Sequence, residues 1–579
     1  GLFAGEEKTL EDLMRIFNKE IIKNATGDVF GRIYEYFLAN FSIQKAHDNG
    51  EFFTPASLVQ TIVNVIEPNH GFILDPACGS GGMFVQSSHF MDASGDTTAR
   101  KVTFYGQEKN PTTIRIAKMN LAVHGLDGKI AEAITYYQDE FELVNKCDFV
   151  MANPPFNVDL VDSARASEDR RRLPFGLPGI NKGGKVSNGN YLWISYFYSY
   201  LNEKGRAGFV MSSQASSAGH DEKEVRRRII ETGDVDAMIS IRPNFFYTRS
   251  VPCELWFFNR AKPKEYKDKV LMLDARNIYR KVTRKVFDFS PEQMNNIAAI
   301  IWLYRGVTDK YLKLIEQYFG NVCDECGLIP KELATFEETF IALQDITIKF
   351  QKSVKANKEV DSEKKTEYNE AIKELADTFA AYDVDRTKLL TNIEHFQRKT
   401  CSKIPADNKT QSKAREIFDP YSESIKGIIK QIDMLFKLVS RCIDIAEKEL
   451  DAKDSEDYDT RLVMRTKKEL DAQRKTAVEQ LKLARYFYKQ IQWLQERFPD
   501  AKLRDVQGLV KLADLEEIEA NDWSLTPGRY VGVAAQEESE EDGEFEEKLR
   551  DIHVELASLN EEAAELAKVI AGNFEELSL

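Results

Sequence analysis

Four consecutive residues, Asn153-Pro154-Pro155-Phe156, carry groups suited to holding an amine that acts as a nucleophile. The Asn side-chain oxygen and the Pro154 carbonyl are both acceptors, so together they can receive two N–H bonds from one amino group. Two prolines restrict the backbone and stiffen the loop, and Phe156 offers a flat face for stacking a base. Two acceptors would also favour positive charge developing on the amine nitrogen. The alternative for so short a motif is a rigid turn.

A second segment, Asp75-Pro76-Ala77-Cys78-Gly79-Ser80-Gly81-Gly82, predicts a site for an adenosine-type ligand. Glycines where a strand turns into a helix let a ligand approach the bare backbone. The next apolar run ends in Glu108, and an acid at the tip of the second strand can accept both ribose hydroxyls. The spacing is not Gly-x-Gly-x-x-Gly and no Gly-Lys-Ser/Thr follows, so neither a dinucleotide nor ATP is expected. An ordinary tight turn is the alternative.

These segments need a scaffold that brings them together, and a pattern of apolar runs and helical stretches predicts one. The seven runs are Gly71–Ala77, Thr103–Glu108, Ile130–Ile134, Asp148–Ala152, Ala207–Ser213, Val235–Ile241 and Glu254–Asn259. This alternation favours an α/β fold with a mostly parallel, doubly wound sheet. Both motifs follow such runs, and ligands bind at the carboxyl ends of parallel strands. Thr54-Pro55 is typical of a helix start, with Thr as the cap and Pro first in the helix.

The rest of the chain is mainly helical in pattern. A short strand is predicted at Val270–Leu273, and residues 310–510 are long, charged and helical. Apolar stripes there, such as Met434, Leu435, Leu438, Val439 and Cys442, are typical of helix packing rather than of a cofactor site. A Pro/Gly break at 525–530 precedes an acidic run, 537–547, and a heptad-like apolar face over 545–577. That face predicts either a hairpin within the chain or a docking element for a partner.

Charge is distributed unevenly over the 579 residues, whose net charge is −15. Residues 511–579 hold 20 acids and 5 bases, whereas residues 151–310 hold 26 bases and 18 acids. The acidity therefore belongs to the terminal segment, and it does not exclude nucleic acid from the middle of the chain. No apolar run approaches the roughly 20 residues that span a bilayer, and no signal peptide opens the chain. Because the first residue is Gly, we expect a trimmed or incompletely represented N-terminus.

Seven cysteines in a chain of this length predict reduced thiols and a cytoplasmic location rather than a disulfide framework. Cys323-x-x-Cys326 has no second pair and no His at zinc-ligand spacing, so reduced thiols are favoured over a metal site there. The seven His are scattered without ligand spacing. No metal is expected.

Taken in order, the motifs resemble those of the S-adenosylmethionine-dependent amino-methyltransferases that modify adenine at N6 in DNA. The order is Glu51-Phe52-Phe53-Thr54-Pro55, Asp75–Gly82, Gln107-Glu108-Lys109-Asn110-Pro111 and Asn153–Phe156. More narrowly, the chain is similar to the modification (M) subunit of type I restriction-modification systems. Further matches are Gly27–Phe41, Met119-Asn120-Leu121, Asn190-Tyr191-Leu192-Trp193 and Trp523–Val531. The similarity covers roughly residues 25–305 and 511–579, and no motif is matched in 310–510.

The resemblance implies a Rossmann-like seven-stranded methyltransferase domain and S-adenosyl-L-methionine as cofactor. It assigns catalysis to Asn153, Pro154, Pro155 and Phe156, with the base stacked by Phe156 and by Phe245 or Phe246. Ile241-Arg242 precede Pro243 in this last segment, where the family pattern has Leu next to the proline. The cofactor residues implied are Glu51, Phe52, Phe53, Thr54, Pro55, Ala56, Asp75, Ala77, Cys78, Gly79, Ser80, Gly81, Gly82, Glu108 as ribose ligand, Asn110, and Asp139 as adenine-contacting acid.

Five cations in a Gly-rich stretch are candidates for contacts with the DNA backbone: Arg170, Arg171, Arg172, Lys182 and Lys185. The alternative for such a run is a solvated face. The boundaries expected are an N-terminal helical segment (1–50), the methyltransferase domain (51–262), a connector (263–310), a helical region (311–510) and an acidic helical tail for assembly (511–579).

The function implied is that of a site-specific, adenine-N6 DNA methyltransferase acting on double-stranded DNA after base flipping. No helix-turn-helix or zinc-finger pattern is present to read sequence, and in the family a separate specificity (S) subunit does so. The implied partners are that subunit, a second copy of the modification subunit and, in addition, a restriction (R) subunit; no membrane is involved. The alternatives are an amino-methyltransferase acting on RNA or protein glutamine, and a non-catalytic assembly subunit.

Overall fold

The computed structural model describes residues 54–93, 101–246, 252–282, 286–356, 361–455 and 457–533. The predicted N-terminal helical segment, the Gly27–Phe41 match and Glu51, Phe52 and Phe53 lie outside the described residues, as do the acidic run and the heptad-like face of the tail. Within the described ranges, no helix combines the length and the apolar character that crossing a membrane requires.

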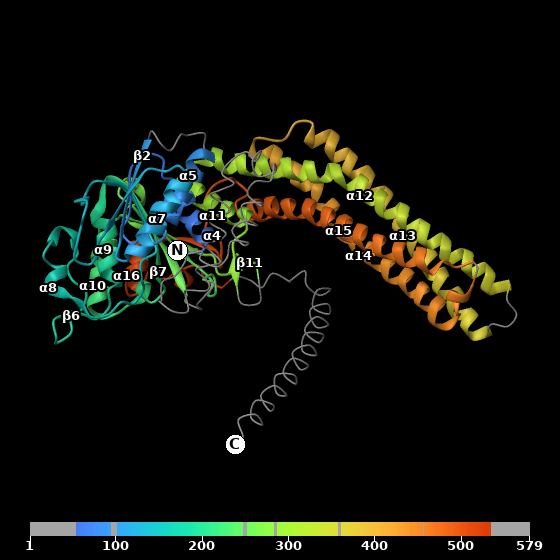
Figure 1. The fold of residues 1–579 in the computed structure, drawn as a ribbon. Helices are drawn as coiled ribbons and strands as arrows, with labels where there is room; N and C mark the ends of the chain where they lie inside the picture. The colour runs from blue at the N-terminus through green and yellow to red at the C-terminus, as the bar shows by residue number, and fades with distance from the viewer. Residues whose placement is uncertain are drawn as a thin grey trace, which may run out of the picture.

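A nine-stranded sheet forms the centre of one half of the molecule (Figure 1). Its strands are β1 (Gly71–Asp75), β2 (Val102–Glu108), β3 (Gly128–Glu132), β4 (Cys147–Ala152), β7 (Leu201–Ser212), β8 (Val235–Ser240), β9 (Cys253–Asn259), β10 (Lys269–Asp274) and β13 (Val510–Asp514). Their order is β13-β10-β8-β9-β7-β4-β1-β2-β3. All pairs are parallel except those that β9 makes with β7 and β8, and the pair of β10 with β13. The predicted α/β class and all seven predicted strands are confirmed, and the short strand expected near 270 is β10.

Helices cover both faces of the sheet, which explains why its central strands are apolar on both sides. One face packs on α4 (Ala56–Ile66), α5 (Gly82–Ala93), α7 (Pro111–Val123) and α11 (Pro291–Tyr304). The other packs on α9 (Asn190–Tyr200), α10 (His220–Glu231) and α16 (Leu515–Ala520). The minor elements are β5 (Val161–Asp162), α8 (Ser163–Ala166), η1 (Arg170–Arg172), β6 (Lys185–Val186), η2 (Ala215–Ser217), η3 (Lys264–Tyr266), β11 (Arg280–Lys281), β12 (Phe287–Asp288), η5 (Ala452–Asp454) and η6 (Pro527–Arg529).

The start of α4 differs from the prediction. Pro55 is the cap residue and Ala56 the first helical residue, so Thr54 is not the cap. The Thr54 hydroxyl instead accepts a hydrogen bond from Asn153, 99 positions away in sequence, at 2.8 Å. Local sequence rules find a capping hydroxyl but cannot detect a competing partner from a distant strand.

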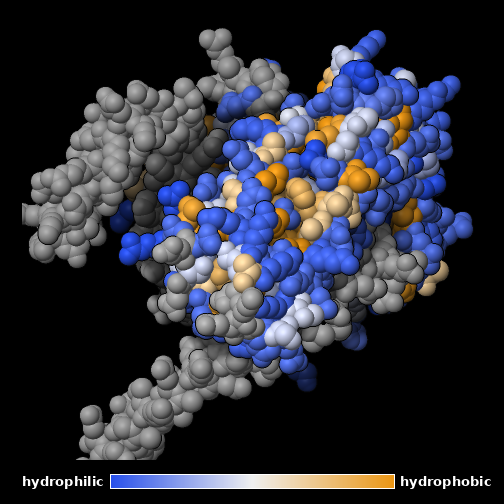
Figure 2. Space-filling view, turned by 90° about the vertical axis from the view of Figure 1, so that its right-hand side faces the viewer, coloured by the Kyte–Doolittle hydropathy of each residue, from blue (hydrophilic) through white to orange (hydrophobic). Residues whose placement is uncertain are grey.

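Four long helices form an arm that projects from the sheet half of the molecule (Figure 1). They are α12 (Thr308–Ala356), α13 (Ser362–Phe396), α14 (Asn408–Glu449) and α15 (Thr460–Arg497), with a short π-helix, η4 (Gln397–Cys401), between the second and third. At about 1.5 Å per residue, α12 is roughly 70 Å long. The apolar stripe predicted on α14 is buried, except that Met434 is 48% exposed. Figure 2, with the right-hand side of Figure 1 toward the viewer, shows a mainly hydrophilic surface on which hydrophobic residues gather near the middle.

The chain returns from the arm to complete the sheet. β13 pairs with β10 from Lys269↔Asp514 to Leu273↔Val510. Beyond it, Arg226 is 1% exposed and its Nε donates to the Trp523 carbonyl oxygen at 2.6 Å. The predicted connector and the first part of the predicted tail therefore share a sheet with the strands of 71–259, and the arm is an insertion between two neighbouring strands.

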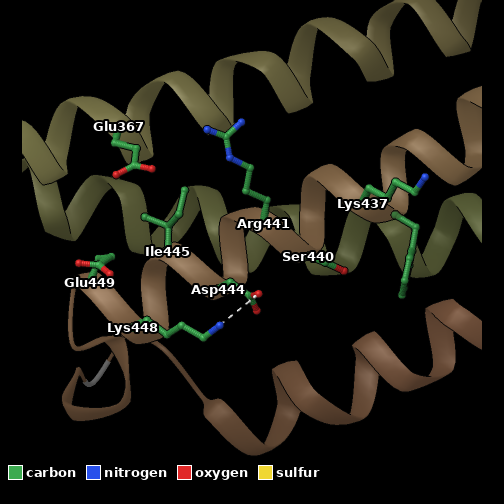
Figure 3. Close-up of a pocket in the computed structure, with 9 residues that line it drawn as sticks. Glu367, Lys437, Ser440, Arg441, Asp444, Ile445, Lys448 and Glu449 are labelled. Carbon is green, nitrogen blue, oxygen red and sulfur yellow. Dashed lines mark ion pairs between the residues drawn. The ribbon is translucent and has the colours of Figure 1, made fainter. Parts of the chain in front are cut away.

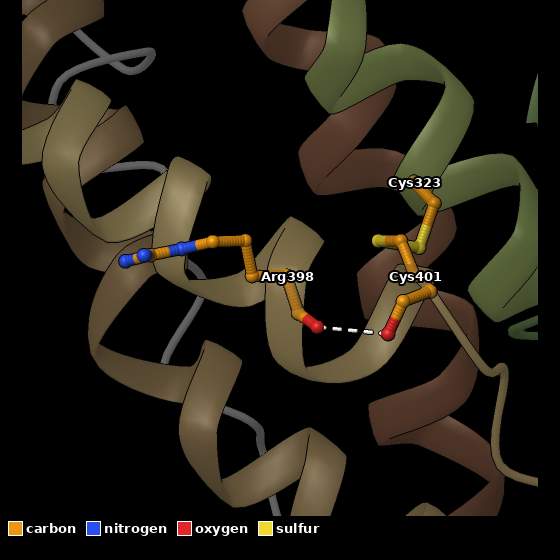
Figure 4. The surroundings of a disulfide bond; sticks show 4 residues. Cys323, Arg398 and Cys401 are labelled. Carbon is orange, nitrogen blue, oxygen red and sulfur yellow. Dashed lines mark hydrogen bonds between the residues drawn. A yellow bond between two sulfur atoms is a disulfide. The ribbon is translucent and has the colours of Figure 1, made fainter.

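The cysteine prediction was wrong for one pair. Cys323 on α12 forms a disulfide with Cys401 of η4, 78 positions later, with the Cα atoms 5.6 Å apart (Figure 4). The five other cysteines are free and buried. The turn around Cys401 is also held by Ser402, whose Oγ donates to the Arg398 carbonyl oxygen at 2.8 Å. The pairing could not be seen from cysteine spacing, because it depends on α13 folding back along α12.

Candidate cofactor and amine site

The glycine-rich loop connects β1 to α5 and is anchored on two sides. The backbone N–H of Cys78 donates to the Gln107 carbonyl oxygen at 3.0 Å, and Asn120 Nδ2 donates to the Ser80 carbonyl oxygen at 2.9 Å. Gly79 has φ +51°, a conformation that side chains disfavour. A Cβ atom added to Gly79 or Gly82 would meet no atom within 4 Å. The loop therefore presents fixed backbone next to open space, as a cofactor cradle requires.

Glu108 stands half-buried at the end of β2, beside this loop. Its Oε2 accepts from the Gly79 N–H at 3.3 Å, and its Oε1 accepts from the N–H groups of Lys109 and Asn110 at 2.8 and 3.0 Å. These bonds fix the carboxylate and leave it lone pairs for further donors. Asn110, predicted to contact the cofactor, caps α7 by accepting from Thr112 N–H at 2.9 Å.

Asp75 is a buried carboxyl at the start of the same loop. It is 2% exposed, and its Oδ1 accepts from the Ala77 N–H at 3.0 Å. Burial, assisted by the nearby charge of Glu108 and opposed by that hydrogen bond, raises the pKa of Asp75 to about 8. A carboxyl held in this way gains most from a cationic partner, such as an ammonium group.

Cys78, in the middle of the loop, is a packing residue. It is 5% exposed, and burial raises the pKa of its thiol well above the usual range. A Cβ atom on Gly106 would lie 2.8 Å from Cys78 Sγ, so the two small residues fit against each other. Cys78 thus contributes backbone and shape rather than a nucleophile.

Asn153 lies directly after β4 and holds one of its two polar atoms unpaired. Its Nδ2 donates to Thr54 Oγ1 at 2.8 Å. Its Oδ1 is buried and has no hydrogen-bond partner among the described residues. Buried polar atoms are rarely left unsatisfied in folded proteins. The unpaired oxygen is therefore available to accept a hydrogen bond from a bound group.

The loop after Phe156 is locked by an asparagine on α9. Asn157 has φ +54°, its N–H donates to Asn190 Oδ1 at 2.8 Å, and its Oδ1 accepts from Asn190 Nδ2 at 2.8 Å. Asn190 itself is 2% exposed. This reciprocal pair holds the backbone that carries Phe156.

The three predicted stacking residues separate into two roles. The rings of Phe156 and Phe246 meet edge to face, with centroids 6.3 Å apart and planes at 87°. Phe245 is 1% exposed and packs on Phe289 with centroids 4.6 Å apart, so it belongs to the core. A planar base needs parallel faces, so one of the rings of Phe156 and Phe246 must turn to admit it.

Asp139 lies on a loop fastened beside the glycine-rich segment. Thr135 Oγ1 donates to the Pro76 carbonyl oxygen at 2.6 Å, and Gln107 Oε1 accepts from the Glu140 N–H at 2.8 Å. Asp139 Oδ1 accepts from the Leu143 N–H at 3.3 Å, while its buried Oδ2 has no partner in the described part of the chain. Burial raises the pKa of Asp139.

The five cations predicted to contact DNA differ in their exposure and in their ion pairs. Arg172 is 2% exposed, lies 4.1 Å from the Tyr196 ring centroid and donates to the Thr135 carbonyl oxygen, so the prediction for it was wrong. Arg171 pairs with Asp169 at 2.8 Å, and Lys185 with Asp162 at 2.7 Å. Arg170 and Lys182 are exposed. The run looks uniform in sequence, but η1 turns its third arginine into the core.

Sequence reasoning missed the positioning roles of Gln107, Asn120 and Asn190. All three are buried amides that hold loop backbone. The segments that contain them were recognised through resemblance, but no spacing rule identified what their side chains do. Their partners lie between 33 and 40 positions away.

A cavity lies away from this site, on the arm. It measures about 540 Å³ and is lined by Glu367, Phe436, Lys437, Ser440, Arg441, Asp444, Ile445, Lys448 and Glu449 (Figure 3). Its charges are of both signs, and Lys448 and Asp444 pair at 3.5 Å. Throughout the described ranges, no cluster of three or more His, Cys, Asp or Glu is placed to hold a metal.

Comparison with known families gives a match over most of the chain. The model described as N-6 DNA Methylase matches residues 25–318 and 408–540. The match extends into 408–510, where the sequence had shown no family motif. The gap between the two matched segments, 319–407, almost coincides with the loop that the Cys323–Cys401 disulfide closes.

Individual relatives agree with this match. The type I restriction enzyme MjaIX methylase subunit of Methanocaldococcus jannaschii is 36% identical over 355 residues, covering 60% of this chain and 60% of the relative. The type I restriction enzyme HindI methylase subunit of Haemophilus influenzae is 34% identical over 311 residues, covering 51% and 67%. A crystal structure of a type I methyltransferase subunit from Streptococcus thermophilus aligns with TM-score 0.41 and 23% identity over 48% of this chain and 58% of its own. The chain thus spans about three-fifths of the first of these relatives.

Proposed function

Because the chain belongs to the N-6 DNA methylase family, we propose that it is the catalytic modification subunit of a type I restriction-modification complex. It transfers a methyl group to the exocyclic N6 amine of an adenine extruded from double-stranded DNA. The observation that carries this proposal is the buried, unpaired Oδ1 of Asn153, the residue before Pro154. This oxygen and the Pro154 carbonyl would supply the two acceptors that an amino group with two N–H bonds can use.

The residues around the glycine-rich loop fit S-adenosyl-L-methionine, which supplies an electrophilic methyl group when bound. Gly79 and Gly82 leave the room that such a ligand needs. Asp75 is suited to its ammonium group, Glu108 to its ribose hydroxyls, and the free Oδ2 of Asp139 to its adenine amino group. The hydrogen bond from Asn153 to Thr54 holds Thr54 and the following Pro55 beside the Asn153–Phe156 motif.

The chain's own groups then orient the adenine. Extrusion of a base costs a few kcal/mol, and stacking on Phe156 with Phe246 would offset part of that cost. Asn153 Oδ1 and the Pro154 carbonyl hold N6 by its two hydrogens and stabilise positive charge as it develops there. No general base is required before attack, because the proton leaves the methylated nitrogen afterwards. Positioning supplies much of the acceleration.

The proposal includes partners. A specificity subunit reads the DNA target, a second modification subunit completes the methyltransferase, and a restriction subunit joins the full complex in the cytoplasm. The proposal rests on family resemblance and on the names of the relatives, which are methylase subunits of type I restriction enzymes. The intact Asn153–Phe156 motif and the formed cofactor loop count against a non-catalytic subunit.

Labelled methyl transfer tests this function. The full chain, with and without its specificity subunit, is given labelled S-adenosyl-L-methionine and either DNA, RNA or protein rich in glutamine. We expect label in N6-methyladenine of DNA, weakly with the chain alone and strongly with the partner. Label in RNA or protein would favour the alternative substrates. Robust site-specific methylation by the chain alone would refute the need for a specificity subunit.

A further inference from the structure

A basic pocket lies next to the proposed base site. It measures about 440 Å³ and is lined by Arg242, Pro243, Asn244, Arg276, Asn277 and Phe287. Arg242 follows the end of β8 and Arg276 follows the end of β10, two parallel neighbours paired at Ser240 and Asp274. The pocket therefore opens at the carboxyl ends of these strands, the edge at which such sheets bind ligands.

Arg242 is a cation held in place without a counter-charge. Its guanidinium lies 4.4 Å from the Tyr279 ring centroid and 4.6 Å from that of Phe287. Neither a carboxylate nor a carbonyl among the described residues is recorded as bonding to it. Stacking on rings holds a guanidinium by its faces and leaves the in-plane N–H groups available, an arrangement suited to phosphate oxygens.

Arg276 adds a second guanidinium, and some of its N–H donors are not used within the described residues. Its Nε donates to Asp274 Oδ1 at 2.8 Å and its Nη2 to Asp274 Oδ2, leaving its Nη1 donors, and its side chain is 54% exposed. The neighbouring acids are already engaged: Asp274 by Arg276, and Asp288 by Arg280 at 3.2 Å. Glu254, which interacts with Arg276, is buried and its pKa is raised to about 8, chiefly by burial. The pocket therefore keeps a net positive charge near neutrality.

The pocket is tied to the base site by a short, anchored stretch of chain. Asn244, with φ +71°, accepts from the Phe287 N–H at 3.0 Å through its carbonyl oxygen, and Phe245 is fixed in the core. Phe246, the ring facing Phe156, is four residues from Arg242, so their Cα atoms are at most about 14 Å apart. Phosphates of one DNA strand follow each other every ~3.4 Å along the helix axis. A strand whose base enters between Phe156 and Phe246 would pass its flanking phosphates by the pocket.

We propose that Arg242 and Arg276 bind a backbone phosphate of the DNA strand that carries the target adenine, within a few nucleotides of it. The proposal rests on the proposed function. The resemblance implies Leu at the position of Arg242, so the family pattern does not account for this arginine. Fixing the flanking phosphate would hold the strand while its base turns out, because phosphate contacts set register without reading sequence.

Salt dependence of DNA binding tests the contact. The full chain with its specificity subunit is titrated onto a duplex at 50–200 mM salt, as wild type and as Arg242→Gln. Losing one phosphate contact lowers the magnitude of the slope of log K against log salt by about 0.9. The fall in affinity between 50 and 200 mM salt should therefore be roughly 3.5-fold smaller for the variant than for the wild type. Arg227→Gln is the control, because Arg227 is 39% exposed on α10 and pairs with Glu224; its slope should equal that of the wild type.

Two further measurements separate a DNA phosphate contact from binding of free phosphate. Asn277→Asp places a negative charge in the pocket at an exposed position, without disturbing the Arg242 stack, and should weaken DNA binding while leaving cofactor binding unchanged. Inorganic phosphate is added as competitor. Wild-type slopes for both Arg242→Gln and Asn277→Asp would overturn the phosphate contact, as would saturable, Arg242-dependent phosphate binding with unaltered DNA binding. Failure of the wild-type complex to bind DNA at all would instead overturn the proposed function.

Discussion

Asn153 donates to Thr54 with one end of its amide and offers the other end to nothing in the described structure. The bond to Thr54 orients the side chain, so the free oxygen is preorganised for the substrate rather than mobile. Thr54 belongs to the segment that precedes the cofactor loop. One hydrogen bond thus links the part of the chain expected to cover the cofactor with the part proposed to hold the amine.

Replacing Asn153 tests this arrangement directly. We expect Asn153→Ala to bind S-adenosyl-L-methionine as the wild type does and to lose at least about 10²-fold in methyl transfer, because a positioned group at the developing charge is removed. Isothermal titration and labelled transfer provide the two measurements. Asn69→Ala, an exposed asparagine before β1, is the matched control and should change neither. Retained transfer in Asn153→Ala would contradict the assigned role.

Asp75 connects cofactor binding to pH. Its folded-state pKa of about 8 lies above the ordinary value of 3.8 because of burial. The unfolded chain releases this proton near pH 4 and the folded chain keeps it until about pH 8, so the carboxyl increasingly destabilises the fold as pH rises between these values. We expect Asp75→Asn to raise the melting temperature, more at pH 8 than at pH 5, and to weaken cofactor binding.

Thermal unfolding at pH 5 and pH 8 checks the predicted change in melting temperature. Titration with S-adenosyl-L-homocysteine, the product left after methyl transfer, checks the predicted loss of cofactor binding. Asp127→Asn, an exposed aspartate, serves as control and should show no pH-dependent gain. An equal gain at pH 5 and pH 8 would mean that Asp75 is ionised in the folded chain.

At the scale of elements, the site depends on strand ends and on the helices that lock them. The seven strands were predictable because each is a short apolar run bounded by helical stretches. The motif residues were predictable because they follow those runs at the ligand-binding edge. Arg172, Phe245 and Thr54 were not, because their burial or their partners depend on contacts with distant segments. For the same reason, the pairing of Cys323 with Cys401 has no local signal.

That disulfide should stabilise the arm under oxidising conditions. By the loop-entropy relation, closing a loop of 78 residues contributes up to roughly 4.5 kcal/mol. We expect Cys323→Ser to lower the midpoint of arm unfolding in urea without reductant, and to have little effect once reductant opens the bond in the wild type. Thiol counts on denatured protein, before and after reduction, report the pairing.

The double variant supplies the control for the disulfide. If the bond is the cause, Cys323→Ser with Cys401→Ser should be no less stable than either single variant, because one substitution already removes it. Additive losses would show that each cysteine contributes through packing instead.

For the whole molecule, the arm and one face of the sheet share one continuous core, which reaches tip residues such as Phe350, Tyr368 and Tyr458. At mid-arm, Phe340 stacks on Phe379 with centroids 5.0 Å apart, and Arg474 pairs with Asp433. These contacts mark a level at which all four helices can be shortened together. Removing 343–376 and 439–468, each replaced by a short flexible turn, would keep both helix pairs in register.

We expect this shortened chain to fold and to bind S-adenosyl-L-methionine within about 0.5 kcal/mol of the full chain, because distant sites are energetically independent. Titration of the cofactor and a melting curve are the measurements. A chain with only 343–376 removed is the comparison, and should aggregate because the distal part of α14 loses its partner on α13. Loss of cofactor binding in the symmetric variant would show that the arm tip supports the catalytic half.

The insertion of the arm between β10 and β13 also sets a schedule for synthesis. The two strands are adjacent in the sheet but separated by about 240 residues of chain. At the ~5–20 residues per second of translation, β13 emerges roughly 10–50 s after β10. During that interval β10 is an open sheet edge, and such edges recruit other strands. The sheet therefore emerges from the ribosome with the edge of β10 unpaired. β13 covers that edge only after the whole arm has been synthesised.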